Sequence, residues 1–175
     1  GIENDKNTLE VARKLFQRCS FQLNDCRNLP FSDGYFDSII LRDVLHHLYT
    51  TDDFYEIKKE LLRVCRNRII IYDPNLNFIL KLLRIISFHK DEECSYNKAL
   101  SVVKDMNLKI TYKNFNTLFS LPLSGGYVFY NFIPGIVFIQ KYILKFENFI
   151  ENVLNKVGIS RFLCLRYLII CEKLQ

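Results

Sequence analysis

The apolar positions in the first half of the chain follow two alternating patterns. Short continuous apolar runs predict strands, and apolar residues spaced three to four apart between polar ones predict helices. The run at Phe36–Leu41 is apolar on both faces, which is typical of the middle of a parallel sheet. The predicted order is strand 1–3, helix 7–17, strand 20–23, strand 36–41, helix 54–64 and strand 68–72. This alternation indicates an α/β fold with a mostly parallel sheet.

The second half adds two helices and two strands. An apolar helix is predicted over Leu76–Phe88. The next helix starts at the capping residue Ser95 and ends at Asn107, because asparagine tolerates a left-handed backbone. Two strands, Leu108–Tyr112 and Cys164–Glu172, are separated by a long connection, so we expect them to form an antiparallel pair.

The connection between these strands contains no charged residue from 114 through 140. Prolines, glycines and an asparagine interrupt it, so no apolar run approaches the about 20 residues that a membrane-spanning helix needs. From Ile139 onward, apolar residues recur at helical spacing, with Lys141, Lys145, Glu147 and Glu151 on the opposite face. We expect this amphipathic helix to pack on the sheet; the alternative is a surface that docks on lipid or covers a hydrophobic substrate.

Composition places the chain among globular proteins with a single core. Its 175 residues suit one domain, and 49% hydrophobic with 25% charged residues argue against disorder. The net charge of +5 is scattered, without the basic stripe of a nucleic-acid surface, so no nucleic-acid partner is expected. The six cysteines have neither C-x-x-C pairing nor metal-ligand spacing. They therefore indicate small buried side chains in a reducing compartment, and no metal site is expected.

Polar motifs follow the predicted strands, at the ends where open α/β sheets bind their ligands. They are Gly1-Ile-Glu3, Asn24-Asp25-Cys26, Leu29-Pro-Phe-Ser-Asp-Gly-Tyr-Phe-Asp37, Val44-Leu-His-His-Leu48, Glu60-Leu-Leu-Arg-Val64 and Ile71-Tyr-Asp-Pro74. In this order and at these spacings, the motifs resemble those of class I S-adenosylmethionine-dependent methyltransferases. Residues 1–74 carry the resemblance, and the rest of the chain is similar only in outline.

The resemblance implies a doubly wound, Rossmann-like methyltransferase sheet, mostly parallel with an antiparallel carboxyl-terminal pair. It implies one methyltransferase-like domain over residues 1–175, in which 1–74 bind the cofactor and 75–163 form a variable lid and substrate region. Segments 95–112 and 164–172 would complete the sheet. None of the six glycines forms the G-x-G cluster of the family's cofactor turn. That turn is expected upstream of Gly1, so we expect an N-terminally truncated chain, either part of a working enzyme or a natural remnant.

The cofactor that the resemblance implies is S-adenosylmethionine. Glu3 would accept both ribose hydroxyls, since a carboxylate offers two acceptor oxygens. Asp25 would bind the adenine amine, the backbone N–H of Cys26 would face the ring, and Arg42 would lie near the sulfonium end. The alternatives are a surface acid at Glu3, an aspartate turn at Asp25, and a pair between Arg42 and Asp43 in solvent.

The candidates on the acceptor side follow the later strands. His46 and His47 are adjacent and point about 100° apart on a helical turn, so one of them faces the pocket. We select His47 and Asp73 as catalytic candidates, and Tyr72 and His89 as substrate residues. The alternatives are a packing histidine at position 47, a purely conformational role for the 72–74 turn, and a solvated loop around His89.

Together, these features predict methyl transfer from S-adenosylmethionine to a small or lipid-like acceptor in the cytoplasm. The apolar 76–88 helix and the uncharged 114–140 segment would cover the site, and their lack of charge favours a hydrophobic substrate. The competing interpretation is a non-catalytic remnant or accessory subunit that acts through protein or membrane contacts. Peripheral membrane contact and an oligomer stay open, because a truncated sheet would expose strand edges that attract a partner.

Overall fold

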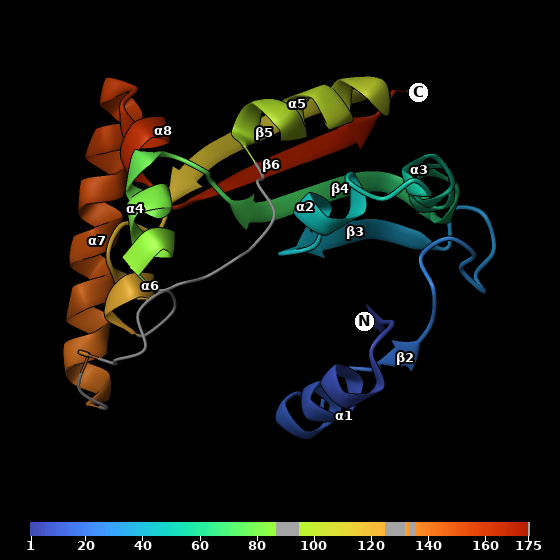
Figure 1. Ribbon diagram of the computed structural model, residues 1–175, viewed down its shortest axis with the longest axis horizontal. Coiled ribbons are helices and arrows are strands. Elements are labelled where there is room, and N and C mark those ends of the chain that lie inside the picture. The colour runs from blue at the N-terminus through green and yellow to red at the C-terminus, as the bar shows by residue number, and fades with distance from the viewer. Residues whose placement is uncertain (87–94, 125–131, 134–135, 175) are drawn as a thin grey trace.

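The chain folds into a small parallel pair of strands beside a four-stranded mixed sheet, as its computed structural model shows (Figure 1). The structure describes residues 1–86, 95–124, 132–133 and 136–174. The strands are β1 (Ile2–Glu3), β2 (Gln22–Leu23), β3 (Phe36–Arg42), β4 (Cys65–Pro74), β5 (Leu108–Asn116) and β6 (Arg166–Lys173). The helices are α1 (Lys6–Leu15), α2 (Leu45–Leu48), α3 (Phe54–Val64), α4 (Phe78–Ile86), α5 (Tyr96–Asp105), α6 (Ser120–Leu123), α7 (Val137–Val157) and α8 (Ser160–Leu163).

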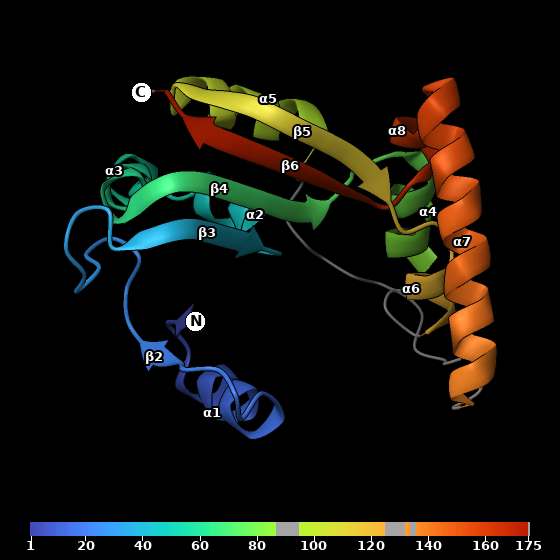
Figure 2. The same ribbon diagram turned by 180° about the vertical axis from the view of Figure 1, so that it is seen from behind.

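The main sheet has the order β3-β4-β6-β5, and β1 pairs with β2 in a separate parallel sheet. β3 and β4 are parallel, whereas β6 lies between β4 and β5 and runs against both (Figure 2). β4 and β5 therefore point the same way, and β6 alone has the opposite direction in the main sheet. This confirms the predicted α/β sheet with an antiparallel carboxyl-terminal pair.

β3 is an edge strand of the main sheet, although the sequence pattern suited a central one. It pairs with β4, with Ile39 opposite Ile69, while β1 and β2 form their own sheet and do not join it. The Ile40 side chain is consequently 66% exposed. Periodicity indicates that a strand is apolar on both faces, but it does not tell which strands are its neighbours.

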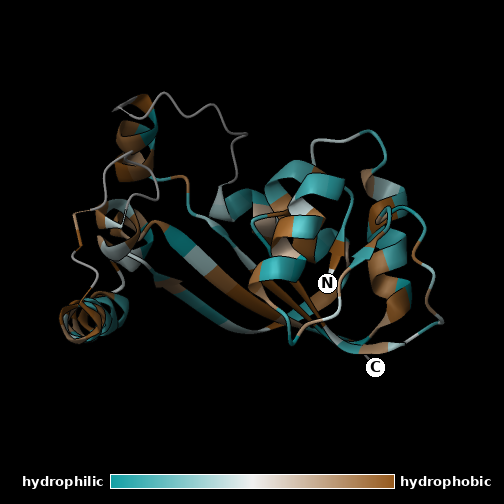
Figure 3. Ribbon diagram, turned by 90° about the horizontal axis from the view of Figure 1, so that it is seen from below, coloured by the Kyte–Doolittle hydropathy of each residue, from teal (hydrophilic) through white to brown (hydrophobic). Residues whose placement is uncertain are grey.

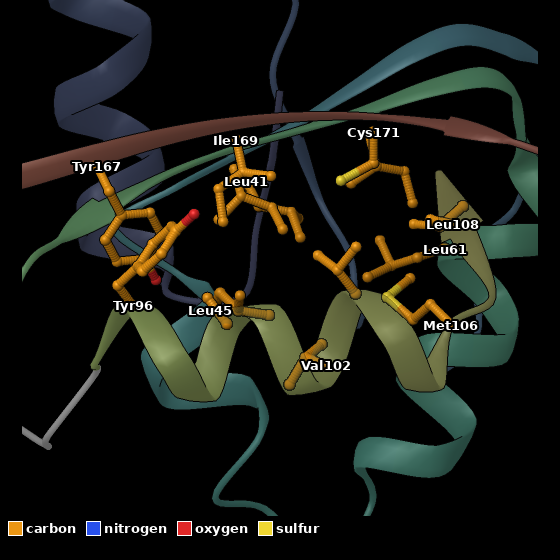
Figure 4. Packing of buried hydrophobic residues seen from close by; sticks show 14 of the residues in the cluster. Leu41, Leu45, Leu61, Tyr96, Val102, Met106, Leu108, Tyr167, Ile169 and Cys171 are labelled. Carbon is orange, nitrogen blue, oxygen red and sulfur yellow. The ribbon is translucent and has the colours of Figure 1, made fainter. Parts of the chain in front are cut away.

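The core lies between one face of the main sheet and helices α3 and α5 (Figure 4). Alternate residues of a strand point to the same face, so Ile69 and Ile71 of β4 and Ile169 and Cys171 of β6 are all fully buried there. α5 covers them with its buried side chains Tyr96, Ala99, Val102 and Val103. Each large apolar side chain buried in this way contributes about 1.5–3 kcal/mol, so the cluster fixes the strands whose ends carry the site.

Polar residues set the ends of two helices. The side chain of Asp5 accepts the N–H of Thr8 at 2.7 Å before α1, and Ser95 accepts the N–H of Lys98 at 3.3 Å before α5. Asn107 follows α5 with a φ of 53°. The predicted cap at Ser95 and the predicted left-handed stop at Asn107 are both confirmed, because each depends on local chemistry alone.

The five described cysteines are free thiols. Cys65, Cys164 and Cys171 are fully buried, and burial raises the pKa of Cys164 to about 12 and that of Cys171 to about 11. These three are the small buried side chains that the sequence predicted, whereas Cys19 is exposed. Within the described ranges, no three His, Cys, Asp or Glu side chains gather in a way that could hold a metal ion.

A pair of residues on α3 holds the loop that leads into β3. Glu60 Oε2 accepts the N–H of Leu29 at 2.8 Å, and Arg63 donates to the carbonyl oxygens of Leu29 and Phe31 at 3.0 and 2.7 Å. The Arg63 guanidinium also bonds both oxygens of Glu60 and, as the main cause, lowers the pKa of Glu60 to about 2. The 29–37 and 60–64 motifs therefore form one structural unit that fixes where β3 starts.

Candidate functional site

The predicted strand-end residues fall into two groups in space. Glu3, Asp25 and Cys26 belong to the unit built from β1 and β2. Arg42, Tyr72 and Asp73 lie at the carboxyl ends of the parallel neighbours β3 and β4. Because carboxyl ends of parallel strands meet at one edge, the second group forms one side of a candidate ligand site.

Glu3 ends β1 and is half-buried. Its Oε1 accepts the backbone N–H groups of Asn4 at 2.8 Å and Asp5 at 3.1 Å. In the part of the chain that the structure describes, Oε2 accepts no hydrogen bond. One oxygen of this carboxylate therefore holds the turn into α1, and the other is left to accept a hydroxyl from a ligand.

Asp25 lies in the turn after β2, and Arg27 engages both of its oxygens. Oδ1 accepts the backbone N–H of Arg27 at 2.9 Å, and Oδ2 accepts the side-chain Nε at 2.8 Å. The side chain of Arg27, and then its backbone N–H, lower the pKa of Asp25. This is the geometry of an aspartate turn, which the sequence left open as an alternative. Among the described residues, no backbone carbonyl oxygen accepts the N–H of Cys26.

Asp43 directly follows β3 and joins two arginines. Its φ of 53° lies in the left-handed region, which aspartate tolerates better than most residues. Its carboxylate accepts Nη2 of Arg166 and lies 3.6 Å from Nε of Arg42. The Arg166 guanidinium also stacks 4.3 Å from the ring centroid of Tyr72. The pair between Arg42 and Asp43 is therefore present, with Arg166 as a third member.

A cavity of about 380 Å³ opens between this cluster, the segment after β5, and α7. Its polar lining is Arg42, Tyr72, Thr117, Ser120, Ser124, Gln140 and Arg166. Its apolar lining is Leu121, Ile133, Ile143 and Leu144. This volume lies in the range of small-molecule sites, which also combine apolar walls with a few polar groups.

Arg166 is the most deeply placed charged residue of the cavity lining, at 7% exposed. Its Nε has no hydrogen-bond partner among the described residues. An unpaired buried N–H costs about 1–3 kcal/mol, so this guanidinium has donor capacity that the described chain leaves unused. The cavity can therefore receive a group that accepts hydrogen bonds.

Asp73 is fully buried and ties the end of β4 to the start of α2. Its Oδ1 accepts the N–H of Val44 at 3.2 Å, and its Oδ2 accepts the N–H of His46 at 3.0 Å. Nδ1 of His46 lies 3.1 Å from the same Oδ2, and since a carboxylate only accepts, that nitrogen donates. Asp73 therefore holds the turn that carries Asp43, and it is not part of the cavity lining.

α7 packs inward through two carboxylates, so the helix is turned from its predicted orientation, although Ile143, Ile150 and Leu154 of the predicted apolar face stay half-buried. Glu147 Oε1 accepts the N–H groups of residues 118–120 at 2.7–2.8 Å, and Glu151 Oε1 accepts the N–H of Thr117. Both glutamates are buried, at 3% and 7% exposed. Thr117 has a φ of 64°, and the backbone N–H groups of this turn need hydrogen-bond acceptors. The carboxylates of α7 supply them, so the polar edge of the helix faces inward.

No described helix combines the length and the apolar character that crossing a membrane would require.

The free energy of unfolding is expected to fall as the pH rises from about 4.5 to about 7, because of Glu151. Burial raises the pKa of Glu151 from 4.5 to about 7; the N–H of Thr117 opposes the rise, and the charge of Glu147 adds to it. In this window the folded chain keeps a proton that the unfolded chain releases, so stability falls with rising pH.

Urea unfolding of Glu151→Gln across this window is expected to show a flatter pH dependence, since the amide keeps an acceptor for Thr117 but does not titrate. Glu56→Gln, an exposed change on α3, serves as the control and should retain the wild-type slope. Equal slopes for Glu151→Gln and the wild type would contradict this prediction.

The structure places the remaining candidates as follows. His47 is exposed on α2, while its neighbour His46 is the buried partner of Asp73. His89 lies outside the described residues. Sequence reasoning missed Arg166, although a charged residue inside the apolar 164–171 run was a usable signal. No sequence signal distinguishes His46 from His47, because both lie in the same short turn.

Comparisons with known proteins bear on the family and the fold of the chain. Residues 1–72 match the methyltransferase domain family. No curated protein sequence matches the chain. A SAM-dependent methyltransferase from Methanosarcina mazei has a TM-score of 0.61 at 15% identity, over 99% of this chain and 81% of that one. A SAM-dependent methyltransferase from Archaeoglobus fulgidus has a TM-score of 0.60 at 15% identity, over 99% and 75%.

The [4+2]-cyclase SpnF has a TM-score of 0.56 at 11% identity, over 99% of this chain and 64% of that one. At such identities the solved structures establish a common fold, and a fold hosts more than one reaction. Residues 1–72 therefore match the methyltransferase domain family, and the chain shares the fold of solved SAM-dependent methyltransferases.

Proposed function

We propose that the chain transfers a methyl group from S-adenosylmethionine to a small, largely apolar acceptor in the cavity beside Arg42, Tyr72 and Arg166. The observation that carries the proposal is the family match over residues 1–72, because this range contains Glu3, Asp25 and the loop that delivers β3. The cavity beyond the carboxyl ends of β3 and β4 supports the acceptor side of the proposal.

The β1–β2 unit has groups that fit the cofactor. When bound, S-adenosylmethionine supplies an electrophilic methyl group. Oε2 of Glu3 would accept from a ribose hydroxyl, and the N–H of Cys26 would face the adenine ring. Asp25 would reach the adenine amine once Arg27, whose side chain is 54% exposed, moves off its carboxylate. Arg42 would lie at the methyl end, next to the cavity.

The cavity lining supports a lipid-like acceptor with one polar group. Its walls Leu121, Ile143 and Leu144 suit an apolar body. The guanidinium groups of Arg42 and Arg166 share a single carboxylate, so they suit an acceptor oxygen that carries negative charge. For methyl transfer the protein must hold this acceptor in line with the methyl group and exclude water.

The remaining candidates receive roles that follow from their positions. We assign Tyr72 to the acceptor side, with its hydroxyl 3.2 Å from Asn116 Oδ1. Asp73 is a positioning residue that acts through His46 and the 43–46 turn. His47 would take a proton from acceptors that carry one, and His89 stays a proposed substrate residue.

We further propose that residues 1–74 form the cofactor part and residues 75–163 the substrate part of one domain, acting in the cytoplasm.

The second candidate function is a protein of this fold that transfers no methyl group and serves as a remnant or accessory subunit. The exposed edge of β3 favours it, because an unpaired edge strand attracts a partner strand or a second copy.

Titration calorimetry with S-adenosylmethionine separates the two candidates when it is done on the full-length protein as its gene encodes it. The methyltransferase proposal predicts measurable binding, and the remnant predicts none. Glu3→Gln is expected to weaken binding about 10- to 100-fold, since a hydrogen bond to a charged group contributes about 1.5–3 kcal/mol. Glu10→Gln, an exposed change on α1, is the control and should bind as the wild type does. Wild-type affinity in Glu3→Gln would remove Glu3 from the cofactor site.

A further inference from the structure

The surface of α7 that points away from the molecule is apolar along its whole length. We call its six residues the outer face of α7. Their exposed fractions run from 44% at Val153 to 66% at Phe138. The outer face comprises Phe138, Tyr142, Phe146, Phe149, Val153 and Val157. Soluble proteins rarely expose a contiguous apolar surface of this kind unless it binds something.

The burial of Glu147 and Glu151 explains why this face is exposed. Those carboxylates turn toward the 117–120 backbone, so helical periodicity directs the residues about half a turn away outward. Figure 3 views α7 nearly end-on and shows its outer side mostly in the hydrophobic colour. The ring centroid of Phe119 lies 6.3 Å from that of Phe146, yet in the described part of the chain every side chain of the outer face stays at least 44% exposed.

The charged residues of α7 indicate what kind of surface the outer face of α7 binds. Lys141, Lys145 and Lys156 are exposed on the flank of the outer face, and Lys145 Nζ lies 5.9 Å from the ring centroid of Tyr142. The only acids of the helix are Glu147 and Glu151, and both are buried. A second copy of the chain would present the same acid-free face and offer the lysines no carboxylate from it. Anionic lipid headgroups match both the apolar residues and the lysines.

We propose that the outer face of α7 docks on an anionic membrane surface, with the helix lying in the plane of the interface. The aromatic and valine side chains enter the boundary between headgroups and acyl chains, and the lysines meet the phosphates. α7 is about 32 Å long, so the contact extends over several lipids. Gln140, Ile143 and Leu144 of the same helix line the cavity, so docking brings the cavity close to the lipid.

Flotation of the full chain with vesicles tests this proposal. We expect binding to vesicles of phosphatidylcholine and phosphatidylglycerol, and much weaker binding to phosphatidylcholine alone. Binding is expected to weaken when salt rises from about 0.1 M to about 1 M, because the Debye length shortens from about 10 Å to about 3 Å. Absence of binding to the anionic vesicles would overturn the proposal.

Matched variants separate the outer face from the rest of the surface. The double variant Phe138→Ser and Phe149→Ser is expected to lose at least about tenfold in vesicle affinity, as is Lys141→Glu with Lys145→Glu. Tyr55→Ser and Lys59→Glu are the controls, since both residues are exposed on α3, and Tyr55 is 66% exposed. Wild-type affinity in either double variant would overturn the proposal.

Two further measurements distinguish membrane docking from dimerisation and from unfolding of the variants. Sedimentation velocity would detect a dimer. If the chain were a dimer that the double variant Phe138→Ser with Phe149→Ser dissociates, and if it did not bind vesicles, the outer face of α7 would be a contact between two copies. That result would overturn the membrane proposal. Circular dichroism melting should find both double variants folded, because the replaced side chains are exposed. The proposal does not depend on methyl transfer, so calorimetry with S-adenosylmethionine in the absence of vesicles tests the proposed function separately.

Discussion

Replacing Asp73 by alanine is expected to lower the free energy of unfolding by about 3 kcal/mol or more. The change leaves the N–H groups of Val44 and His46 and the Nδ1 of His46 without their acceptor, in a place where Asp73 itself is fully buried. Urea unfolding measures the loss. Asp73→Asn keeps one carbonyl oxygen and is expected to lose less than the alanine variant.

Asp37→Ala is the matched control, because Asp37 is an aspartate 73% exposed whose ion pair with Arg66 lies on the surface. Its loss should stay within about 1 kcal/mol. A double-mutant cycle of Asp73→Ala and His46→Ala should give a coupling energy of about 1–3 kcal/mol. Equal losses in Asp73→Ala and Asp37→Ala would show that the contact between β4 and α2 does not stabilise the fold.

Replacing Glu147 by alanine is expected to cost about 3 kcal/mol, concentrated where α7 meets the turn after β5. One oxygen of Glu147 accepts three backbone N–H groups, those of Leu118, Phe119 and Ser120. Without it these donors lose their protein acceptor, because the uncharged 114–140 segment has no carboxylate to replace it. Amide hydrogen exchange at these three positions should accelerate by about 100-fold, as expected from a loss of about 3 kcal/mol.

Glu147→Gln and Asn148→Ala complete the test. Glutamine keeps a side-chain oxygen, so exchange at 118–120 should rise less than in the alanine variant. Asn148 is the exposed neighbour on the same helix, and its replacement should leave these amides protected. Exchange rates that are identical in Glu147→Ala and the wild type would mean that α7 is held by its other contacts, such as the hydrogen bond from Asn155 Nδ2 to the Phe115 carbonyl oxygen at 2.9 Å.

Local signals in the sequence were sufficient to predict most of the helices and strands. The strand at 36–41 is observed at Phe36–Arg42 and the helix at 54–64 is observed at Phe54–Val64, because periodicity and flanking turn residues act within a few positions. The stop at Asn107 is likewise a property of one residue and its neighbours. The short early strand is less accurate, since only Gln22–Leu23 of the expected 20–23 pairs with β1.

Tertiary structure decided which side chains meet. Arg42 and Tyr72 are far apart in the chain and were predicted separately, yet they line one cavity because β3 and β4 pair in register, with Arg42 opposite Tyr72. Arg166 joins them because β6 inserts beside β4, with Arg166 opposite Pro74. Strand order is a property of the whole fold, so the sequence pattern placed β3 in the middle of a sheet while the structure places it at an edge.

The orientation of α7 shows most clearly what the sequence determines and what the tertiary structure decides. The sequence by itself determined that an amphipathic helix follows the uncharged segment, because the 3.6-residue period is written in its own residues. Only the tertiary structure decided which face turns inward. The backbone N–H groups of 117–120 need acceptors, and pairing them with buried glutamates took precedence over burying the aromatic face. That demand comes from a turn some 30 residues away in the chain, which a helical pattern does not contain.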